Sequence, residues 1–296
     1  MKIKIVLFLF FVIYSFLLPA TNFELKINGN NSNTQIDSVK ASNWTTQVKT
    51  SFNISHVSFK DWSQGGSNSL TWVFGINSVL NYSDSNWTLK NTQKLSYGRT
   101  KLEEDEFRTN DNEFFIESVV SRKYGWEVDP FFAFSIRSPL SEGYSYKKLP
   151  PSKIANFFDP GYVTQSLGFN YDKIKAIRTR VGIALQEVFT NEFRNHSDDK
   201  ATKEKAEAFK LDTGFESVTD GEIKFDTNIS YKSSFRLFTR FNSLDIWDIR
   251  WDNSILAKVN SYINVSFNFL LIYEKNQSYK TQMKETLLLG LTYTLI

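Results

Sequence analysis

The chain of 296 residues has no cysteine and only two histidines, His56 and His196. The lack of cysteine excludes disulfide bonds, thiolate metal sites and a lipid attached to an N-terminal cysteine. Histidine-dependent catalysis would have to use one of the two histidines, and neither has a flanking motif typical of an activated nucleophile. The sequence also has no Cys/His metal spacing and no glycine-rich phosphate loop with its lysine, so it predicts no cofactor, no metal and no catalytic residue.

Long apolar runs are missing as well, once the N-terminus is passed. The longest, Phe269–Tyr273, is far shorter than the about 20 residues that a membrane-spanning helix needs. Helical membrane spans are therefore excluded. The formal net charge is +3, and the loss of Lys2 and Lys4 with a leader would take it to +1. A nearly neutral chain does not indicate a nucleic acid partner.

The N-terminus has the layout of a secretory signal peptide. Lys2 and Lys4 precede an apolar run, Ile5–Leu18, and a Pro-Ala pair follows it. The run is shorter than a spanning helix and no polybasic segment follows, which favours a cleaved signal over a membrane anchor. We expect residues 1–20 to be a signal peptide and residues 21–42, rich in Asn, Ser and Thr, to be a flexible periplasmic spacer.

Residues 43–296 show the alternation of apolar and polar residues that is typical of β-strands. In the last hairpin the apolar members are Ile263, Val265, Phe267, Phe269, Leu271, Leu287, Leu289, Leu291, Tyr293 and Leu295. A terminal strand with so apolar a face would aggregate in water, whereas lipid requires such a face. About twelve segments of this kind follow one another, each long enough to cross a bilayer at a tilt. They predict an all-β fold, a transmembrane antiparallel up-and-down β-barrel.

The connections between these segments alternate in length. Long connections are predicted at residues 60–68, 100–112, 138–160, 190–208, 233–244 and 274–281, and short ones at 83–86, 125, 172–173, 220–221 and 260–261. Outer-membrane barrels have this asymmetry, with short periplasmic turns and long outer loops, whereas a soluble β-sandwich has no reason to keep it. The pattern therefore predicts the bacterial outer membrane as location, with both termini in the periplasm.

Tryptophan and tyrosine gather at both predicted ends of the strands, as they do at the two membrane interfaces. The short-turn group is Trp44, Tyr82, Trp87, Tyr124, Trp126, Tyr171, Tyr262 and Tyr293, and the outer group is Trp72, Tyr97, Tyr231, Trp247 and Tyr273.

Three local features carry expectations of their own. Glu222–Lys232 alternates most clearly and is expected to be one strand. Pro130 is expected to distort the sheet, because proline cannot donate a ladder hydrogen bond. In the loop at 190–208, Lys and Glu stand at i, i+4 spacing (Lys200 with Glu204, Lys203 with Glu207), which fits either a short helix or a flexible charged loop.

The first predicted loop has a specific motif. Val57–Leu70 reads VSFKDWSQGGSNSL, and shorter motifs follow at 95–98, 108–111, 142–144, 156–162 and 167–168. In this order they resemble the "FSNWAAGGENSLS" signature and later motifs of the DUF3078 family, uncharacterised proteins typical of the Bacteroidetes. The resemblance extends from Trp44 to the C-terminus. It implies an outer-membrane β-barrel and supplies no activity.

The resemblance singles out positions in two outer loops: Trp62, Gly65, Gly66, Asn68, Asn156, Phe157, Phe158, Pro160 and Tyr162. At the first loop, the adjacent glycines allow a tight turn and the tryptophan can anchor it on the barrel rim, although a ligand-binding loop is the alternative.

The polar positions of the predicted strands should face the lumen, and they carry both signs of charge. The candidate lumen charges are Lys49, Lys90, Lys94, Arg137, Arg178, Arg180, Glu216, Glu222, Lys224, Asp226, Asp248, Arg250 and Asp252. Twelve strands enclose more room than eight, which side chains just fill, and less than the sixteen or more of an open porin. The charges could therefore pair and narrow the pore, or only hydrate and brace the inner wall.

Three functions fit these features. The barrel size and polar lumen favour passive or gated passage of a small, unidentified solute. The alternative is surface adhesion or scaffolding through the outer loops, of which 138–160 is the longest. A lipid-acting enzyme using His56 beside Ser69 is the least favoured, and no enzyme activity is expected. The expected partners are outer-membrane lipid and, during insertion, the barrel-assembly machinery.

Overall fold

The computed structural model describes residues 43–60, 66–147, 150–198, 202, 206–275 and 280–294. The expected signal peptide and spacer lie outside these residues, as do the motif positions Trp62 and Gly65. Lys200, Lys203 and Glu204 also lie outside them, so the short helix suggested for the loop at 190–208 stays a prediction. Within the described ranges, no helix is both long and apolar enough to span a membrane.

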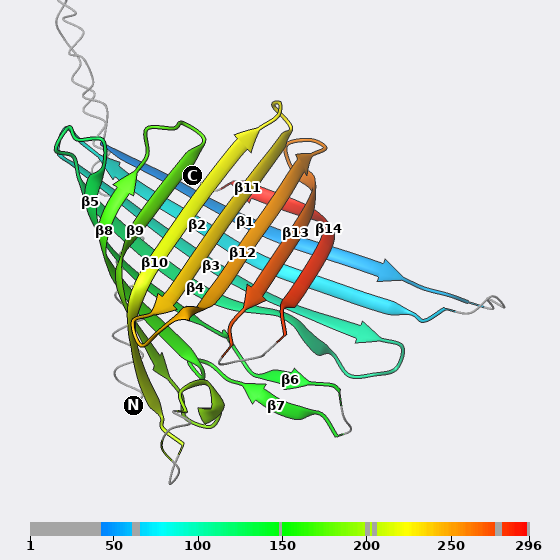
Figure 1. Cartoon of the computed structure of the whole chain (residues 1–296). Helices are drawn as coiled ribbons and strands as arrows, with labels where there is room; N and C mark the ends of the chain where they lie inside the picture. Colours follow the sequence, from blue (N-terminus) through cyan, green and yellow to red (C-terminus); the bar gives the residue numbers. More distant parts are fainter. Residues whose placement is uncertain are drawn as a thin grey trace, which may run out of the picture. The chain divides into compact units, whose positions relative to one another are not determined.

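Twelve strands form one closed antiparallel barrel (Figure 1). They are β1 (Trp44–Val57), β2 (Ser69–Ser83), β3 (Trp87–Leu102), β4 (Arg108–Arg122), β5 (Asp129–Ser138), β8 (Gly161–Tyr171), β9 (Ile177–Phe189), β10 (Phe209–Lys224), β11 (Ile229–Arg240), β12 (Ser243–Lys258), β13 (Ile263–Tyr273) and β14 (Gln282–Thr294). The last strand closes the barrel by pairing with β1, where Thr294 lies opposite Lys49. The predicted up-and-down barrel of about twelve strands is confirmed.

The long connection between β5 and β8 contains a separate hairpin that the sequence pattern did not predict. It consists of β6 (Gly143–Ser145) and β7 (Ser152–Ala155), paired antiparallel. In Figure 1 this hairpin extends beyond the end of the barrel opposite the β10–β11 turn. The lumen opens at both ends of the barrel. The short-turn mouth is the opening beside the turns β2–β3, β4–β5, β8–β9, β10–β11 and β12–β13, and the long-loop mouth is the opening at the opposite end.

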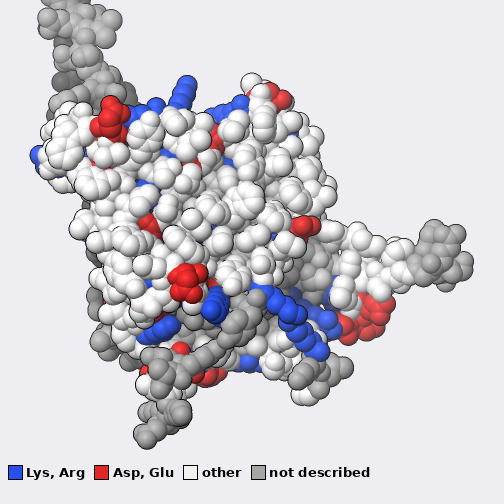
Figure 2. Space-filling view, in the orientation of Figure 1, with Lys and Arg blue, Asp and Glu red and all other residues white. Residues whose placement is uncertain are grey.

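Side chains alternate between the outer wall and the lumen along each strand. Phe225, Ile229, Phe267 and Leu289 are exposed on the outside, by 66%, 37%, 38% and 58%. In Figure 2 the charged atoms gather toward the two ends of the barrel, and the wall between them is mostly uncharged. An exposed apolar band of this kind is the lipid-facing surface of a membrane barrel.

The connection between β10 and β11 differs from the prediction. Asp220 and Gly221 lie inside β10, opposite Ser234 and Ser233 of β11, and the turn is formed by residues 225–228 instead. Glu222–Lys232 is therefore two strand ends joined by a turn, and the predicted long loop at 233–244 is strand except for a two-residue turn after Arg240. Tyr231 consequently lies near the short-turn mouth, not in the outer aromatic group.

Aspartate and asparagine side chains explain where the short turns fall. Asp226 Oδ1 accepts the backbone N–H groups of Asn228 and Ile229 at 2.6 and 2.7 Å. Asp84 does the same for residues 86 and 87, and Asn260 for residues 262 and 263. Such side chains mimic a backbone turn. Asp226 is therefore a turn residue at the rim, and its assignment to the lumen wall was wrong.

The expected distortion at Pro130 is also absent from the described pairings. Pro130 lies opposite Phe169, and neither ladder of β5 shifts register there. The proline is the second residue of β5, close to the β4–β5 turn, where a missing donor is tolerated. The register shifts occur instead at Gly98/Arg99 and at Thr239/Arg240. Nearby, Phe131 faces inward and packs with Val119 and Ala133.

Candidate functional site in the lumen

The alternation places most of the candidate lumen charges on the inner wall. They form three groups along the barrel: one across its middle, one at the long-loop mouth and one at the short-turn mouth. In the first two groups the charges are matched by close partners.

Glu113 on β4 is the centre of the middle group. Its carboxylate lies 2.8 Å from Lys94 Nζ, 2.9 Å from Arg250 Nη2 and 3.7 Å from Arg137 Nε. Arg250 also lies 3.5 Å from Asp252. The sequence pattern identified the three basic residues but missed Glu113. The predicted loop ended at residue 112, so Glu113 stood at the very start of the next predicted strand. The signal that could have found it is the strand's own alternation, since Glu113, Phe115 and Glu117 share the inward face.

The pair of Arg250 and Glu113 crosses the lumen. In the barrel order β1-β14-β13-β12-β11-β10-β9-β8-β5-β4-β3-β2, the strands β12 and β4 are six steps apart in either direction. The two strands therefore face each other across the lumen. A hydrogen bond of 2.9 Å joins Arg250 Nη2 on one strand to Glu113 Oε1 on the other. At this level side chains from opposite walls meet across the lumen.

Further pairs surround this bridge. Arg180 on β9 bonds Glu117 on β4, and Arg236 on β11 lies 2.7 Å from Glu216 and donates to Gln186 at 2.9 Å. Arg180 and Glu216 are exposed by only 6% and 7%. Breaking one partner of a buried, hydrogen-bonded ion pair costs about 3–5 kcal/mol, because the other charge is left uncompensated. The network therefore fixes the arrangement of the interior.

The long-loop mouth holds a second matched group. Arg240 lies 2.8 Å from Asp212 and 2.7 Å from Asp248, and Lys210 lies 3.3 Å from Asp212. The ring of Phe238 is fully buried beneath the Arg240 guanidinium, which lies 5.4 Å from its centroid. Glu274 follows β13 at this mouth, and burial raises the pKa of its carboxyl to about 7.

The motif residues of the outer loops have structural contacts. Gly66 has φ +141°, and a Cβ on it would meet the Phe59 ring at 2.6 Å, so glycine is required there. Asn68 Oδ1 accepts the Phe59 backbone N–H at 2.6 Å. These contacts favour the turn-anchoring role for the described part of the first loop.

The second motif, Asn156–Tyr162, joins the loop to the wall. Phe158 packs against the cluster of Phe114, Ile136 and Val163 on the outward face of β4, β5 and β8. Its backbone N–H donates to Ser138 Oγ at 2.7 Å. Pro160 follows Asp159 through a cis peptide bond, and the Tyr162 hydroxyl lies 3.4 Å from His196 Nδ1. Burial lowers the pKa of His196, which is half-buried.

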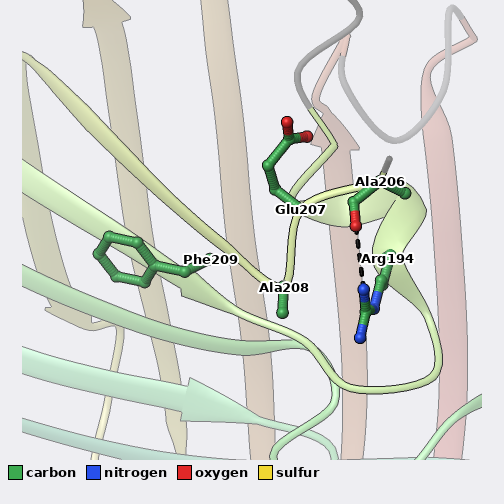
Figure 3. A pocket seen from close by; sticks show the side chains of 5 residues that line it. All are labelled: Arg194, Ala206, Glu207, Ala208 and Phe209. Carbon is green, nitrogen blue, oxygen red and sulfur yellow. Dashed lines mark hydrogen bonds between the residues drawn. The ribbon is translucent and has the colours of Figure 1, made fainter. Parts of the chain in front are cut away.

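Neither a His56–Ser69 pair nor a group of metal ligands is assembled among the described residues. His56 is exposed, and no hydrogen bond joins it to Ser69. No group of three or more His, Cys, Asp or Glu among the described residues could hold a metal ion. A pocket on the β9–β10 loop is lined by Arg194 and residues 206–209 (Figure 3). Arg194 there donates to the carbonyl oxygens of Ala206 and Asn191, each at 3.1 Å, which gives it a loop-holding role.

A closed twelve-stranded barrel with an apolar outer wall and a charged interior defines the class of outer-membrane β-barrel proteins. Within this class, residues 54–144 match the family described as "Protein of unknown function (DUF3078)". The match confirms the resemblance for the first loop and the motifs up to Tyr144. The later motifs, including Asn156–Tyr162, lie beyond the matched stretch. No curated protein sequence matches the chain.

Several solved structures are similar to the chain at low identity. The translocator domain of the autotransporter NalP from Neisseria meningitidis aligns at 8% identity, with 86% of this chain and 90% of that chain covered and a TM-score of 0.39. An outer membrane channel from Pseudomonas putida F1 aligns at 9% identity, over 90% and 99% of the two chains, with a TM-score of 0.37. The outer membrane channel DcaP of Acinetobacter baumannii aligns at 6% identity, over 85% of this chain and 97% of that chain, with a TM-score of 0.30. Scores this low do not bear on strand number or function.

Proposed function

We propose that the protein is a gated outer-membrane channel for small solutes, closed at rest by the charge group around Glu113. The observation that carries the proposal is the contact between Arg250 Nη2 and Glu113 Oε1, 2.9 Å across the lumen between opposite strands. Side chains that touch across the lumen obstruct the passage at that level. The polar wall on both sides of that level is what a passing solute needs.

The bridge is suited to opening because it is made of exchangeable partners. Glu113 has three basic neighbours, and Arg250 has a second acidic partner in Asp252, 3.5 Å away. An entering charged solute can take the place of either side chain, so that each retains a partner while the crossing contact is lost. Ion-conducting pores work in a similar way: an ion binds at several weak sites in turn, so that it can both enter and leave.

Single-channel recording in planar bilayers tests the gate. Wild-type protein is expected to be closed most of the time, and Arg250→Gln, alone or with Glu113→Gln, is expected to raise the open fraction several-fold. The matched control is Asp105→Asn, which breaks the exposed 2.7 Å pair with Arg108 at the β3–β4 loop and leaves the lumen bridge intact. If folded Arg250→Gln, checked by its compact gel mobility without heating, is as closed as the wild type, the proposal fails.

The proposed orientation places both termini and the short turns in the periplasm and the β6–β7 hairpin outside the cell. Because the chain has no cysteine, single substitutions give a clean labelling assay. In intact cells, a membrane-impermeant maleimide is expected to label Ser152→Cys on β7 and not Ser261→Cys in the β12–β13 turn. Labelling of Ser261→Cys alone would reverse the orientation. Outer-membrane lipid and the assembly machinery remain the partners that this placement implies.

The alternative function is surface binding through the outer loops, and one observation favours it. The β6–β7 hairpin and the segment after it expose apolar side chains beyond the wall, with Tyr144, Ile154 and Phe157 exposed by 38%, 49% and 41%. Substituting Tyr144→Ser and Ile154→Ser is then expected to reduce attachment of cells to host or abiotic surfaces while conductance is unchanged. Unchanged attachment would remove this alternative.

A further inference from the structure

The short-turn mouth of the lumen carries an excess of positive charge that the rest of the interior does not have. Inward-facing basic residues lie toward this end of six strands: Lys49 on β1, opposite the last residue of β14, Lys90 on β3, Arg178 on β9, Lys224 on β10, Lys232 on β11 and Lys258 on β12. The registers agree with this placement, since Arg178 lies opposite Asp220, and Glu222 opposite Lys232, on the inner face.

Only two of these six have an acidic partner. Lys90 lies 4.0 Å from Asp220, and Lys232 lies 3.3 Å from Glu222. The other four, Lys49, Arg178, Lys224 and Lys258, form no ion pair within the described part of the chain. Asp226, the acid in the adjacent turn, has one carboxylate oxygen committed to the backbone N–H groups of that turn.

The unpaired charges are close enough to act on one another. Lys49 is within electrostatic reach of Lys224, Lys232 and Lys258, and of one acid, Glu222, although β1 is three to five strands away from β12, β11 and β10 around the wall. Lysines from two parts of the wall therefore converge on the same space. A mouth with an excess of one sign of charge, between low-dielectric walls, concentrates counter-ions of the opposite sign.

We propose that the short-turn mouth binds a small multivalent anion carrying phosphate groups. Lysine is a point-charge partner of phosphate, and several ammonium groups around one opening match an anion with charge on more than one group. A single monovalent anion would leave most of the four unpaired charges uncompensated. The ligand is small because the site lies inside the barrel mouth. The net charge of the whole chain, only +3, does not indicate a nucleic acid as the ligand.

This inference deepens the proposed channel function, since an anion collected at this mouth is the solute class that the Glu113 gate would meet. The binding site does not require conduction, however, and it is tested separately. A site without a pore would bind the anion at equilibrium and show no current, whereas a pore without the site would conduct with no preference for the anion.

Isothermal titration of the full detergent-solubilised chain with pyrophosphate, orthophosphate and chloride, at low ionic strength, tests the site. Saturable binding is expected for pyrophosphate, weaker binding for orthophosphate and none for chloride. The double variant Lys49→Gln, Lys258→Gln is expected to weaken pyrophosphate binding about tenfold or more, as the loss of two charged contacts predicts. Higher salt should weaken it as well.

The control variant is Lys101→Gln, which removes the same charge at the opposite end of β3, where Lys101 lies opposite Leu70. It is expected to bind pyrophosphate as the wild type does. Absence of saturable pyrophosphate binding to the folded wild type, or equal binding by the double variant and the wild type, would overturn the proposal. Equal loss in Lys101→Gln would show a non-specific charge effect, which also overturns it.

Discussion

The carboxylate of Asp159 accepts the backbone N–H of Glu192 at 2.7 Å, joining the β5–β8 loop to the β9–β10 loop. The same carboxylate accepts the N–H of Asn191 at 3.0 Å and of Phe193 at 3.4 Å, and Asp159 is only 4% exposed. Two long outer loops are thus held together by one buried side chain. This explains how the two connections keep a defined position relative to each other at the long-loop mouth.

Replacing Asp159 with alanine is expected to release this junction, because three backbone donors lose a charged acceptor. The loss of hydrogen bonds to a charged group costs about 2 kcal/mol or more of local stability. Hydrogen exchange measured by mass spectrometry should show faster exchange over residues 190–198 and 156–160, with the barrel strands unchanged. Asp198→Ala, in the same loop, is the control. Unaltered exchange in Asp159→Ala would contradict the assignment.

Two glycines of β10 give a matched test of close backbone approach. A Cβ at Gly214 would lie 1.9 Å from the carbonyl oxygen of Thr239 on β11, whereas a Cβ at Gly221 would meet only Ala176 O at 3.8 Å. Gly214→Ala must therefore shift the β10–β11 ladder, at a cost of about 1–3 kcal/mol as for other overpacking changes. Gly221→Ala is expected to be neutral or slightly stabilising. Urea unfolding in lipid vesicles measures both, and equal effects would show that the close approach is relaxed.

Glu274 gives the pH dependence of the long-loop mouth. Burial raises the pKa of its carboxyl to about 7, Asp248 acts in the same direction, and Arg236, Arg240 and Arg137 oppose them. In the unfolded chain the group ionises near its ordinary value of 4.5. Between these values the folded state keeps a proton that the unfolded state has lost. Its contribution to stability is therefore complete below pH 4.5 and is lost as the pH rises through 7.

The expected result is that wild-type Tm in detergent falls between pH 5 and pH 8 by more than it does in Glu274→Gln, in which the side chain no longer titrates. Parallel Tm curves for the two proteins would mean that Glu274 titrates as an ordinary exposed carboxyl.

The β10–β11 turn shows how far the strand pattern could be read from sequence. Apolar residues at 223, 225, 229 and 231 keep one two-residue period across the turn, and only Thr227 interrupts it. The Asp-Gly pair at 220–221 has the composition expected of a turn, so the sequence predicted the turn there. The structure instead uses Asp226, whose carboxylate accepts two backbone N–H groups. The Asp-x-Asn pattern that residues 84–86 and 226–228 share was the available signal.

The amino-acid sequence alone determined that this chain is a barrel with a lipid-facing exterior, because alternation with a period of two is a local property and each strand carries it independently. It also identified most of the charges on the inner wall. Which charges meet was decided only by tertiary structure. Arg250 and Glu113 are 137 positions apart, and no local pattern records that closure of the sheet brings β12 opposite β4. The same closure leaves Lys49 and Lys258 around one mouth, where the sequence showed only mixed charge.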